Sequence, residues 1–389
     1  MFIGIDLGTS AVKSILIDHN QDILATAHSA LTVQSPKDGY NEQDPYSWIK
    51  ATELCLEELK KQKFNEFTNT ISIGISGHMH GATILDKEGE VIRPCILWND
   101  TRSFKECEEF ENQNYDVRKI SGNIAMPGFT GPKINWIKKN EPENFKKIDK
   151  VLLPKDYLRF CLTGEFFSEM SDASGTLWLN IKDRQWSNKL LSASFLEEDH
   201  MPKLVEGNQQ AGIIIKSLKN KFKFNNDVIV VGGAGDNAAS AIGLGVTEER
   251  QSFISLGTSG VFFTPTSSFL SNTKDAVHSF CHCLPGKWHL MSVMLSASNC
   301  LDWICTITGN NINEALKNAE EFSSNSKKII NAPYFLPYMS GERTPHNDPH
   351  VRGSFHYLKT TTDQSAIQYA VLEGISFGIF DGFNSIQSV

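Results

Sequence analysis

Runs of apolar, β-prone residues at the start of the chain predict a strand, a turn and a second strand. Phe2–Asp6 is the first run, and Ser14–Asp18 follows it after a turn of small residues. A further turn at His19-Asn20 leads to a third run, Ile23–Ala27. Strands joined in this way also occur in all-β proteins, so the segments that follow decide the fold class.

A helical spacing of apolar residues comes next. The positions that recur at this spacing lie between residues 46 and 63 and are Trp48, Ile49, Ala51, Cys55, Leu56 and Leu59. Asp44-Pro45 precedes them as a helix start signal. A strand, Ile71–Ile75, and a polar loop at residues 76–81 come after the helix. Strands that alternate with helices predict an α/β domain, in which ligands bind at the loops after the strands.

The rest of the chain predicts an inserted region and then a second lobe. Residues 120–206 are rich in aromatic residues and helix-like runs, which is typical of an insertion around a core. Val228–Val231 predicts a buried strand, and Ala238–Leu244 a helix with Asp236 or Asn237 as its N-cap. We place a domain boundary near residues 245–250, which gives lobes at 1–245 and 246–389. Ala297–Thr308 and Ser365–Ile379 predict two helices of the second lobe.

One short sequence occurs twice in the chain. Leu7-Gly8-Thr9-Ser10-Ala11-Val12 returns with one change as Leu256-Gly257-Thr258-Ser259-Gly260-Val261, and each copy follows an apolar strand. Small residues in a tight turn present backbone N–H groups and hydroxyls to one point, which suits phosphate oxygens. We therefore predict two phosphate-binding turns, Gly8–Ser10 and Gly257–Ser259, in a duplicated nucleotide-binding architecture with a cleft between its halves.

The two copies also differ in the residue that precedes their shared leucine, Leu7 or Leu256. Asp6 occupies this position in the first copy and Ser255 in the second. A carboxylate alone would repel a polyphosphate, so Asp6 favours a site in which Mg²⁺, bound partly through water, lies between them. The alternative is an acid that only caps a turn. Lys13 either adds positive charge to the phosphate site or is an ordinary solvated lysine.

Asp236 lies on a glycine-rich loop between a predicted strand and a helix. A carboxylate at this place can accept the proton of an alcohol whose oxygen attacks the γ-phosphate of ATP. An N-cap is the plainer interpretation, and the two roles are compatible. The same residues also match the G-x-G-x-x-G/A fingerprint of dinucleotide-binding proteins. We discount that match, because an acid inside the loop would face the pyrophosphate without a counter-charge.

Two further loops are candidates for contact with a sugar. Met79 and His80 lie on the polar loop after a predicted strand, although a histidine in such a place is often structural. Trp98 and Asn99 offer the mixed apolar and hydrogen-bonding surface that sugars favour. A tryptophan buried beside a turn is the alternative at that position.

Composition limits the class of protein. The chain has 389 residues, a net charge of −8 and 21% charged residues, which is typical of a globular enzyme and argues against a nucleic-acid-binding protein. Its first residues resemble no signal peptide, and no apolar run reaches the roughly 18 residues of a membrane span. The eight cysteines include Cys281-His282-Cys283 but no paired zinc motif, so we expect reduced, mostly buried thiols, no metal site at the cysteines and a cytoplasmic protein.

Taken together, these motifs resemble those of the FGGY carbohydrate kinases of the actin and hexokinase superfamily. Beyond the turns and loops already described, the segments that carry the resemblance are Met126–Thr130, Lys133 with Trp136, Leu153–Tyr157, Met170–Asp172, Gly235–Ala239, His278–His282 and Ser340–Pro345. They occur in family order over nearly the whole chain. The expected fold is therefore α/β, a duplicated ribonuclease H-like or actin-like ATPase fold with two lobes around a cleft.

The resemblance implies ATP-dependent phosphorylation of D-xylulose to D-xylulose 5-phosphate, with ATP and Mg²⁺. It implies that Asp236 is the general base and Asp6 the acid near Mg²⁺. It also implies that the sugar is bound by Met79, His80, Trp98, Asn99 and Asn237. The nucleotide phosphates would contact the two turns and Lys13. The expected partners are the sugar and ATP, with a homodimer as a further possibility and no nucleic acid or membrane.

Two departures from the family pattern keep alternatives open. Tyr357 stands where a glycine is expected, and Ala366 where an acid or amide is usual. The family's glycine-rich adenine segment is not found, so we expect an incomplete second lobe. The alternatives are a truncated sugar-binding relative without catalysis and a kinase for another pentulose such as ribulose. An actin-like or heat-shock-protein-like ATPase that acts as an interaction protein, or a Rossmann dehydrogenase, is less favoured.

Overall fold

The computed structural model describes residues 1–113 and 116–389. The chain divides into two compact units. The first consists of Met1–Gly245 with Phe280–Lys287, and the second of Val246–Ser279 with Trp288–Val389. Each unit combines a β-sheet with helices, which confirms the predicted α/β class. The short segment at 280–287, which lies beyond the expected boundary at residue 245, packs with the first unit.

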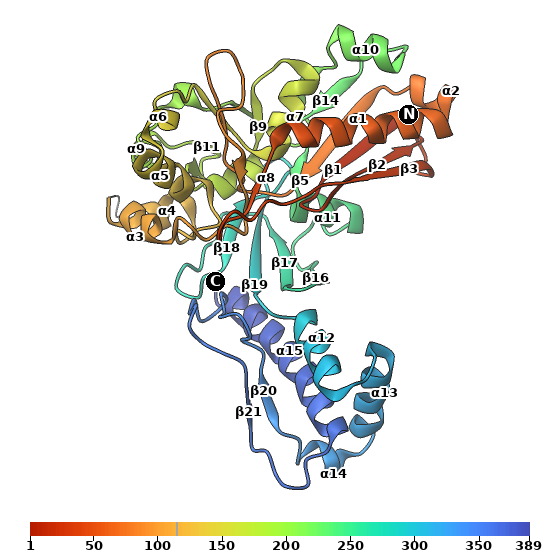
Figure 1. Ribbon diagram of the computed structural model, residues 1–389, viewed down its shortest axis with the longest axis vertical. Coiled ribbons are helices and arrows are strands. Elements are labelled where there is room, and N and C mark those ends of the chain that lie inside the picture. Colours follow the sequence, from red (N-terminus) through yellow and green to blue (C-terminus); the bar gives the residue numbers. More distant parts are fainter. Residues whose placement is uncertain (114–115) are drawn as a thin grey trace. The chain divides into compact units, whose positions relative to one another are not determined.

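A mixed sheet of seven strands forms the centre of the first unit (Figure 1). Its strands are β13 (Gln210–Ile213), β14 (Ile229–Val231), β5 (Ser72–Gly77), β1 (Phe2–Leu7), β2 (Ala11–Ile17) and β3 (Ile23–Ala30), in this order, with β15 (Ala234–Gly235) also paired to β5. The hairpins β1–β2 and β2–β3 are antiparallel. β5 runs parallel to β1 on one side and to β14 and β15 on the other. The carboxyl ends of β1, β5 and β15 therefore lie at one edge of the sheet.

Alternation of side chains explains how the sheet is covered on one face. Ile3, Ile5 and Leu7 of β1 are buried in one core with the apolar positions of α1 (Pro45–Gln62). Figure 1 shows α1 lying along the sheet. The helix begins as its sequence predicts, because the Asp44 side chain accepts a hydrogen bond from the Tyr46 N–H and a proline occupies the first turn.

The remaining elements of the first unit are short. They are β4 (Glu42–Gln43), α2 (Phe64–Thr68), β6 (Thr83–Leu85), β7 (Cys95–Ile96), α3 (Phe104–Gln113), α4 (Val117–Ser121), α5 (Thr130–Asn140), α6 (Pro142–Phe145), β8 (Lys150–Leu152), α7 (Pro154–Thr163), β9 (Phe167–Glu169), α8 (Met170–Ala173), η1 (Ser174–Thr176), β10 (Leu179–Asn180), β11 (Gln185–Trp186), α9 (Asn188–Ser192), η2 (Glu198–His200), β12 (Lys203–Val205), α10 (Lys216–Phe222) and α11 (Asp236–Leu244). More than half of them lie within residues 120–206, the region whose composition predicts an insertion.

The second unit is built around one long helix and a four-stranded sheet with the order β16-β17-β19-β18. Its elements are β16 (Phe253–Leu256), β17 (Gly260–Thr266), the first two residues of β18 (His278–Cys281), β19 (Trp288–Met294), α12 (Ser298–Thr308), α13 (Ile312–Ser323), α14 (Ser326–Ile329), β20 (Tyr334–Leu336), β21 (Ser354–His356) and α15 (Gln364–Gln387). Ala370, Val371 and Ile375 of α15 pack in one core with Ile304 of α12 and Phe335 of β20.

Two helix ends differ from the sequence-based expectations, and the state of the cysteines agrees with them. The predicted N-cap of α11 is wrong, because Gly235 occupies the N-cap position and Asp236 is the first helical residue. The last helix continues to Gln387, beyond the predicted end at Ile379. All eight cysteines are free and seven are buried, as expected. In the two described ranges, we find no helix with the length and apolar character that a membrane span requires.

The packing of α1 yields a stability prediction. Leu59 is completely buried beneath the sheet, whereas Leu54 of the same helix is 49% exposed. We expect Leu59→Ala to lower the free energy of unfolding by about 2–5 kcal/mol, since it removes buried methyl groups and leaves a cavity. Leu54→Ala, the matched control, should change it by less than about 0.5 kcal/mol. Urea denaturation followed by tryptophan fluorescence measures both, and equal effects would contradict the assigned packing.

Candidate active site

Register places the candidate acids at one edge of the first unit's sheet. Asp6 of β1 pairs with Ser76 of β5, and Ala234 of β15 pairs with the same serine. The Ser76 hydroxyl donates a hydrogen bond of 2.8 Å to Asp6 Oδ1. Asp236 follows two residues after Ala234. The geometry therefore brings Asp6 and Asp236 to neighbouring strand ends, as expected for residues that share one site.

The first phosphate-type turn, Gly8–Ser10, is held by its own backbone and by two side chains from elsewhere. The Gly8 N–H donates to the Ala11 carbonyl over 3.0 Å. Gln43 Nε2 donates to the Thr9 carbonyl over 2.7 Å. Trp98 Nε1 donates to the Thr9 hydroxyl over 3.0 Å. The turn is thus fixed before any ligand arrives, which lowers the entropic cost of binding.

Asp236 is a partly buried carboxylate with few stabilising partners. Its Oδ1 accepts hydrogen bonds from the backbone N–H of Asn237 over 2.7 Å and from Asn237 Nδ2 over 3.0 Å. The pKa of Asp236 is raised to about 6, because burial and the negative charge of Asp6 raise it more than the hydrogen bonds from Asn237 lower it. A carboxylate with this pKa is deprotonated at neutral pH and more basic than an ordinary aspartate, which suits a general base.

Met79 and His80 lie on the loop that follows β5. Met79 is buried and packs against Gly235, where an added Cβ would lie 2.9 Å from its sulfur. His80 has a left-handed backbone (φ +69°), a conformation that residues other than glycine seldom adopt. Its Nδ1 lies 2.7 Å from the Gly175 carbonyl, and its ring meets the edge of Phe129. The loop at residues 76–81, called the sugar loop below, and the glycine-rich loop at residues 232–236, called the base loop, are therefore in direct contact.

A buried cation supports the same loop. Lys133 Nζ donates to the His80 carbonyl over 2.9 Å and to the Gly128 carbonyl over 2.6 Å, and the side chain is completely buried. Burial lowers the pKa of Lys133 to about 7. In the sequence, Lys133 stands out only as part of a family motif. Its place four residues into an amphipathic run gave no sign that its ammonium group holds a loop 53 residues away.

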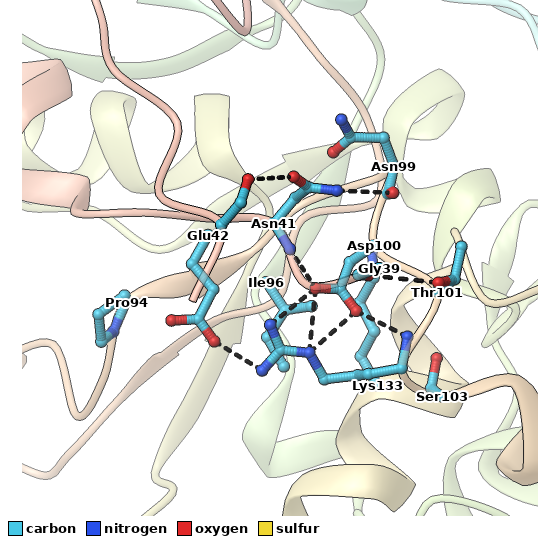
Figure 2. A network of polar contacts seen from close by, with 12 residues as sticks. Gly39, Asn41, Glu42, Pro94, Ile96, Asn99, Asp100, Thr101, Ser103 and Lys133 are labelled. Carbon is cyan, nitrogen blue, oxygen red and sulfur yellow. Dashed lines mark hydrogen bonds and ion pairs between the residues drawn. The ribbon is translucent and has the colours of Figure 1, made fainter. Parts of the chain in front are cut away.

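Trp98 and Asn99 are exposed, and the residues that follow them join a buried ionic network; Figure 2 shows Asn99 beside Asn41, Glu42 and Asp100 of this network. Trp98 is 44% exposed, which rules out the buried-tryptophan alternative. Asp100 lies below it, almost fully buried, and accepts hydrogen bonds from the Asn41 N–H and from Arg102 Nε and Nη2. Arg102 Nη1 also bonds Glu42 over 2.6 Å. Asn99 is itself exposed, and its carbonyl accepts from Asn41 Nδ2.

A pocket of about 590 Å³ opens on the face of the sheet opposite α1. Its lining includes Asp6, Lys13, Ser76 and Ala234, together with apolar residues of β5 and α11. Lys13 is exposed at this pocket. The volume is in the range of small-molecule sites. The side chain of Lys13 is therefore free to reach an anion beside Asp6 or to remain solvated.

The second turn, Gly257–Ser259, belongs to the second unit. The Gly257 N–H donates to the Ser259 carbonyl over 3.0 Å. Two N–H groups at the start of α12 bond the turn from outside, Ala297 to Thr258 and Ser298 to Gly257, each over 2.9 Å. Each turn is closed by a bond from its glycine N–H, to the third residue on in the first turn and to the second residue on in the second, and the two differ in what supports them. Side chains hold the first, and a helix start holds the second.

Comparison with known proteins identifies the class. The chain matches the N-terminal domain of the FGGY family of carbohydrate kinases over residues 1–243 and the C-terminal domain of that family over residues 252–388. The protein belongs to this family. It is accordingly a sugar kinase that uses ATP as co-substrate.

Individual relatives point to one member of the family. The chain is 46% identical over its whole length to "Xylulose kinase" of Escherichia coli (strain K12), of which it covers 79%, and 45% identical to "Xylulose kinase" of Klebsiella pneumoniae, with the same coverage. Among solved structures it is similar to a "xyloylose kinase" from Brucella ovis, with 48% identity and a TM-score of 0.96 over 99% of this chain and 79% of that one.

The network beneath Trp98 generates a second stability prediction. Asp100→Asn removes one of the two carboxylates that pair with the buried Arg102 guanidinium and leaves only Glu42, and breaking a buried ion pair costs up to about 3–5 kcal/mol. We expect a loss of this size in urea denaturation. Glu143→Gln removes the exposed partner of Lys146 and should leave the midpoint unchanged. A stable Asp100→Asn protein would show that the network does not support this loop.

Proposed function

We propose that this protein is a xylulose kinase that transfers the γ-phosphate of ATP to the 5-hydroxyl of D-xylulose. The observation that carries the proposal is Asp236, a carboxylate with a raised pKa that directly follows Gly235, the residue packed against Met79. Relatives named xylulose kinase are 36–46% identical to almost the whole chain. Kinases of alcohols require one acceptor for the hydroxyl proton and fixed sites for the phosphates.

In this mechanism Asp236 receives the proton of the sugar hydroxyl as its oxygen attacks phosphorus. Asn237 fixes the carboxylate, since two of its nitrogens bond Oδ1 and leave Oδ2 for the substrate. Met79 and His80 bind the sugar, and Trp98 and Asn99 complete its surroundings from the exposed loop. Catalysis then consists mainly of positioning and of charge stabilisation.

The phosphates are assigned to the two turns and to Lys13. Gly8–Ser10 acts from the lobe 1–245, and Gly257–Ser259 from the lobe 246–389. The carboxylate of Asp6, which Ser76 orients through one oxygen, fits a hydrated Mg²⁺ because this ion combines one or two carboxylates with water and phosphate ligands. When bound, Mg²⁺ would neutralise charge on the phosphates. A cytoplasmic location and a homodimer stay predictions, the latter checked by sedimentation.

Removal of the base tests the assignment. We expect Asp236→Asn to lower kcat by about 10²–10⁴-fold, the usual contribution of general base catalysis, while calorimetry shows binding of D-xylulose and ATP within about threefold of the original. ADP release measured with a coupled enzyme assay gives kcat. Asp227→Asn, which changes an exposed aspartate of the same unit, is the matched control and should keep full activity. A fully active Asp236→Asn protein would refute the role.

The same assay with a panel of ketoses tests the substrate. D-Xylulose should have the highest kcat/KM, followed by D-ribulose, which differs from it at one stereocentre. A preference for ribulose would move the assignment to another pentulose kinase. Binding of sugar without ADP release would favour the non-catalytic alternative.

The raised pKa of Asp236 predicts the acid side of the pH profile. Only the deprotonated carboxylate can accept a proton, so kcat/KM should rise as the pH increases through about 6 and reach a plateau near pH 7. Assays between pH 5 and 8 at constant ionic strength measure this. A profile that stays flat down to pH 5 would show that the titrating group is not the base.

A further inference from the structure

The segment Met170–Thr176, formed by α8 and η1, is completely enclosed by protein although half of it is polar. Ser171, Asp172 and Ser174 have no exposed surface, and Thr176 has almost none. Buried polar side chains are costly unless each is hydrogen-bonded, so a polar segment at this depth calls for a reason. Its contacts supply one, because they lead to both halves of the candidate active site.

One contact leads to the base. The backbone N–H of Gly235, the residue before Asp236, donates to the Ser171 hydroxyl over 3.0 Å. The same hydroxyl lies 2.8 Å from both carboxylate oxygens of Glu169 and donates its single proton there. With one bond donated and one accepted, the hydroxyl has a single orientation. Gly235 is therefore tied to Glu169 through Ser171.

A second contact leads to the sugar loop. The Gly175 carbonyl lies 2.7 Å from His80 Nδ1. A Cβ added at Gly175 would lie 2.4 Å from the same nitrogen, so the two residues are as close as their atoms allow. The segment thus touches the loop that carries Asp236 at one end and the loop that carries His80 at the other.

A buried ionic cluster fixes the segment from behind. Lys155 Nζ lies 2.8 Å from Asp156, 3.4 Å from Glu169 and 3.3 Å from Asp172, and none of the four side chains is exposed. Arg159 joins the cluster through Asp156 at 2.7 Å. Nη1 of Arg159 donates a hydrogen bond of 2.7 Å to the carbonyl of Gly232, which lies on the loop before Asp236. The base loop is accordingly held at Gly232 by Arg159 and at Gly235 by Ser171.

We propose that Ser171 is a positioning residue for phosphoryl transfer, which sets the place of the Asp236 carboxylate by holding the Gly235 N–H against the buried Glu169. The proposal rests on the proposed function of Asp236 as base. The contact in question joins Ser171 to the backbone of Gly235 and not to the sugar. A displacement of the base by as little as 1 Å is enough to cost about 10²-fold in rate, while substrate binding is retained.

The test compares two buried serines in the same unit. Ser171→Ala removes the acceptor for Gly235, and we expect kcat to fall about 10- to 100-fold, with KM for D-xylulose within about twofold. Ser121→Ala is the matched control. Its hydroxyl is equally buried and likewise donates one bond, to the Val117 carbonyl, and accepts one, from the Asn123 N–H, but both partners belong to α4 and its end. It should keep kcat.

A double substitution separates positioning from general damage. If Ser171 acts through Asp236, Ser171→Ala should cause no further loss of kcat in a protein that already carries Asp236→Asn. Ser171→Cys keeps the shape of the side chain with a slightly larger atom but offers only a weak acceptor, so it should lower kcat in a protein that folds even where the alanine variant does not.

Three outcomes would overturn the proposal. They are an unchanged kcat in folded Ser171→Ala or Ser171→Cys, a rise in KM that accounts for the whole loss of kcat/KM, and independent, multiplying losses in the double variant. Failure of the proposed function looks different. In that case the original protein phosphorylates no ketose, or Asp236→Asn is fully active, before any Ser171 variant is compared.

Discussion

The parallel pairing of β5 with β1 and with β15 is the constraint on which the first unit's site depends. Ser76 lies opposite Asp6 on one side and opposite Ala234 on the other. Three segments separated by about 70 and 160 residues along the chain thereby end at one sheet edge. Because Met79 and His80 follow one of these strand ends and Asp236 follows another, a shift of register in β5 would separate them.

The close approach of the loops adds a second requirement, which glycine meets. At Gly233 a Cβ would lie 1.9 Å from the Ile75 carbonyl oxygen, and the backbone there has a φ of +78°. Gly235 has no room for a side chain beside Met79. The glycines before Asp236 thus allow the base loop to pack against β5 and the sugar loop. This close packing, rather than a dinucleotide-binding fingerprint, explains why glycines occupy these positions.

Much of this arrangement could be predicted from local sequence, and the part that could not is tertiary. The boundaries of α1 follow from Asp44, Pro45 and a regular apolar spacing, which are local signals. The sequence around Asp236 also predicts its place on a glycine-rich loop between a strand and a helix. It did not give the N-cap, because the predicted caps were Asp236 or Asn237, whereas Gly235, whose N–H is bound by the distant Ser171, occupies that position.

The exposure of Trp98 and the role of Ser171 were out of reach for a similar reason. Trp98 is exposed because Asp100 and Arg102, two and four residues later, are buried as a pair with Glu42 from a distant strand. Ser171 is recognisable as part of a motif, but its partner Gly235 lies 64 residues away. The short segment 280–287 packs with the first unit, although its sequence places it well inside the second lobe.

The charged cluster behind the base loop has a physical logic that stability alone does not provide. Two cations and three carboxylates are removed from water there, and desolvation raises the pKa of Asp172 well above its ordinary value. Well-packed apolar residues of the same volume would often be as stable or more so. Apolar packing is non-directional, however, whereas Arg159 and Ser171 each bond one named atom of the base loop. Directional contacts are what a carboxylate needs when its distance from a reacting hydroxyl must be set within a fraction of an ångström.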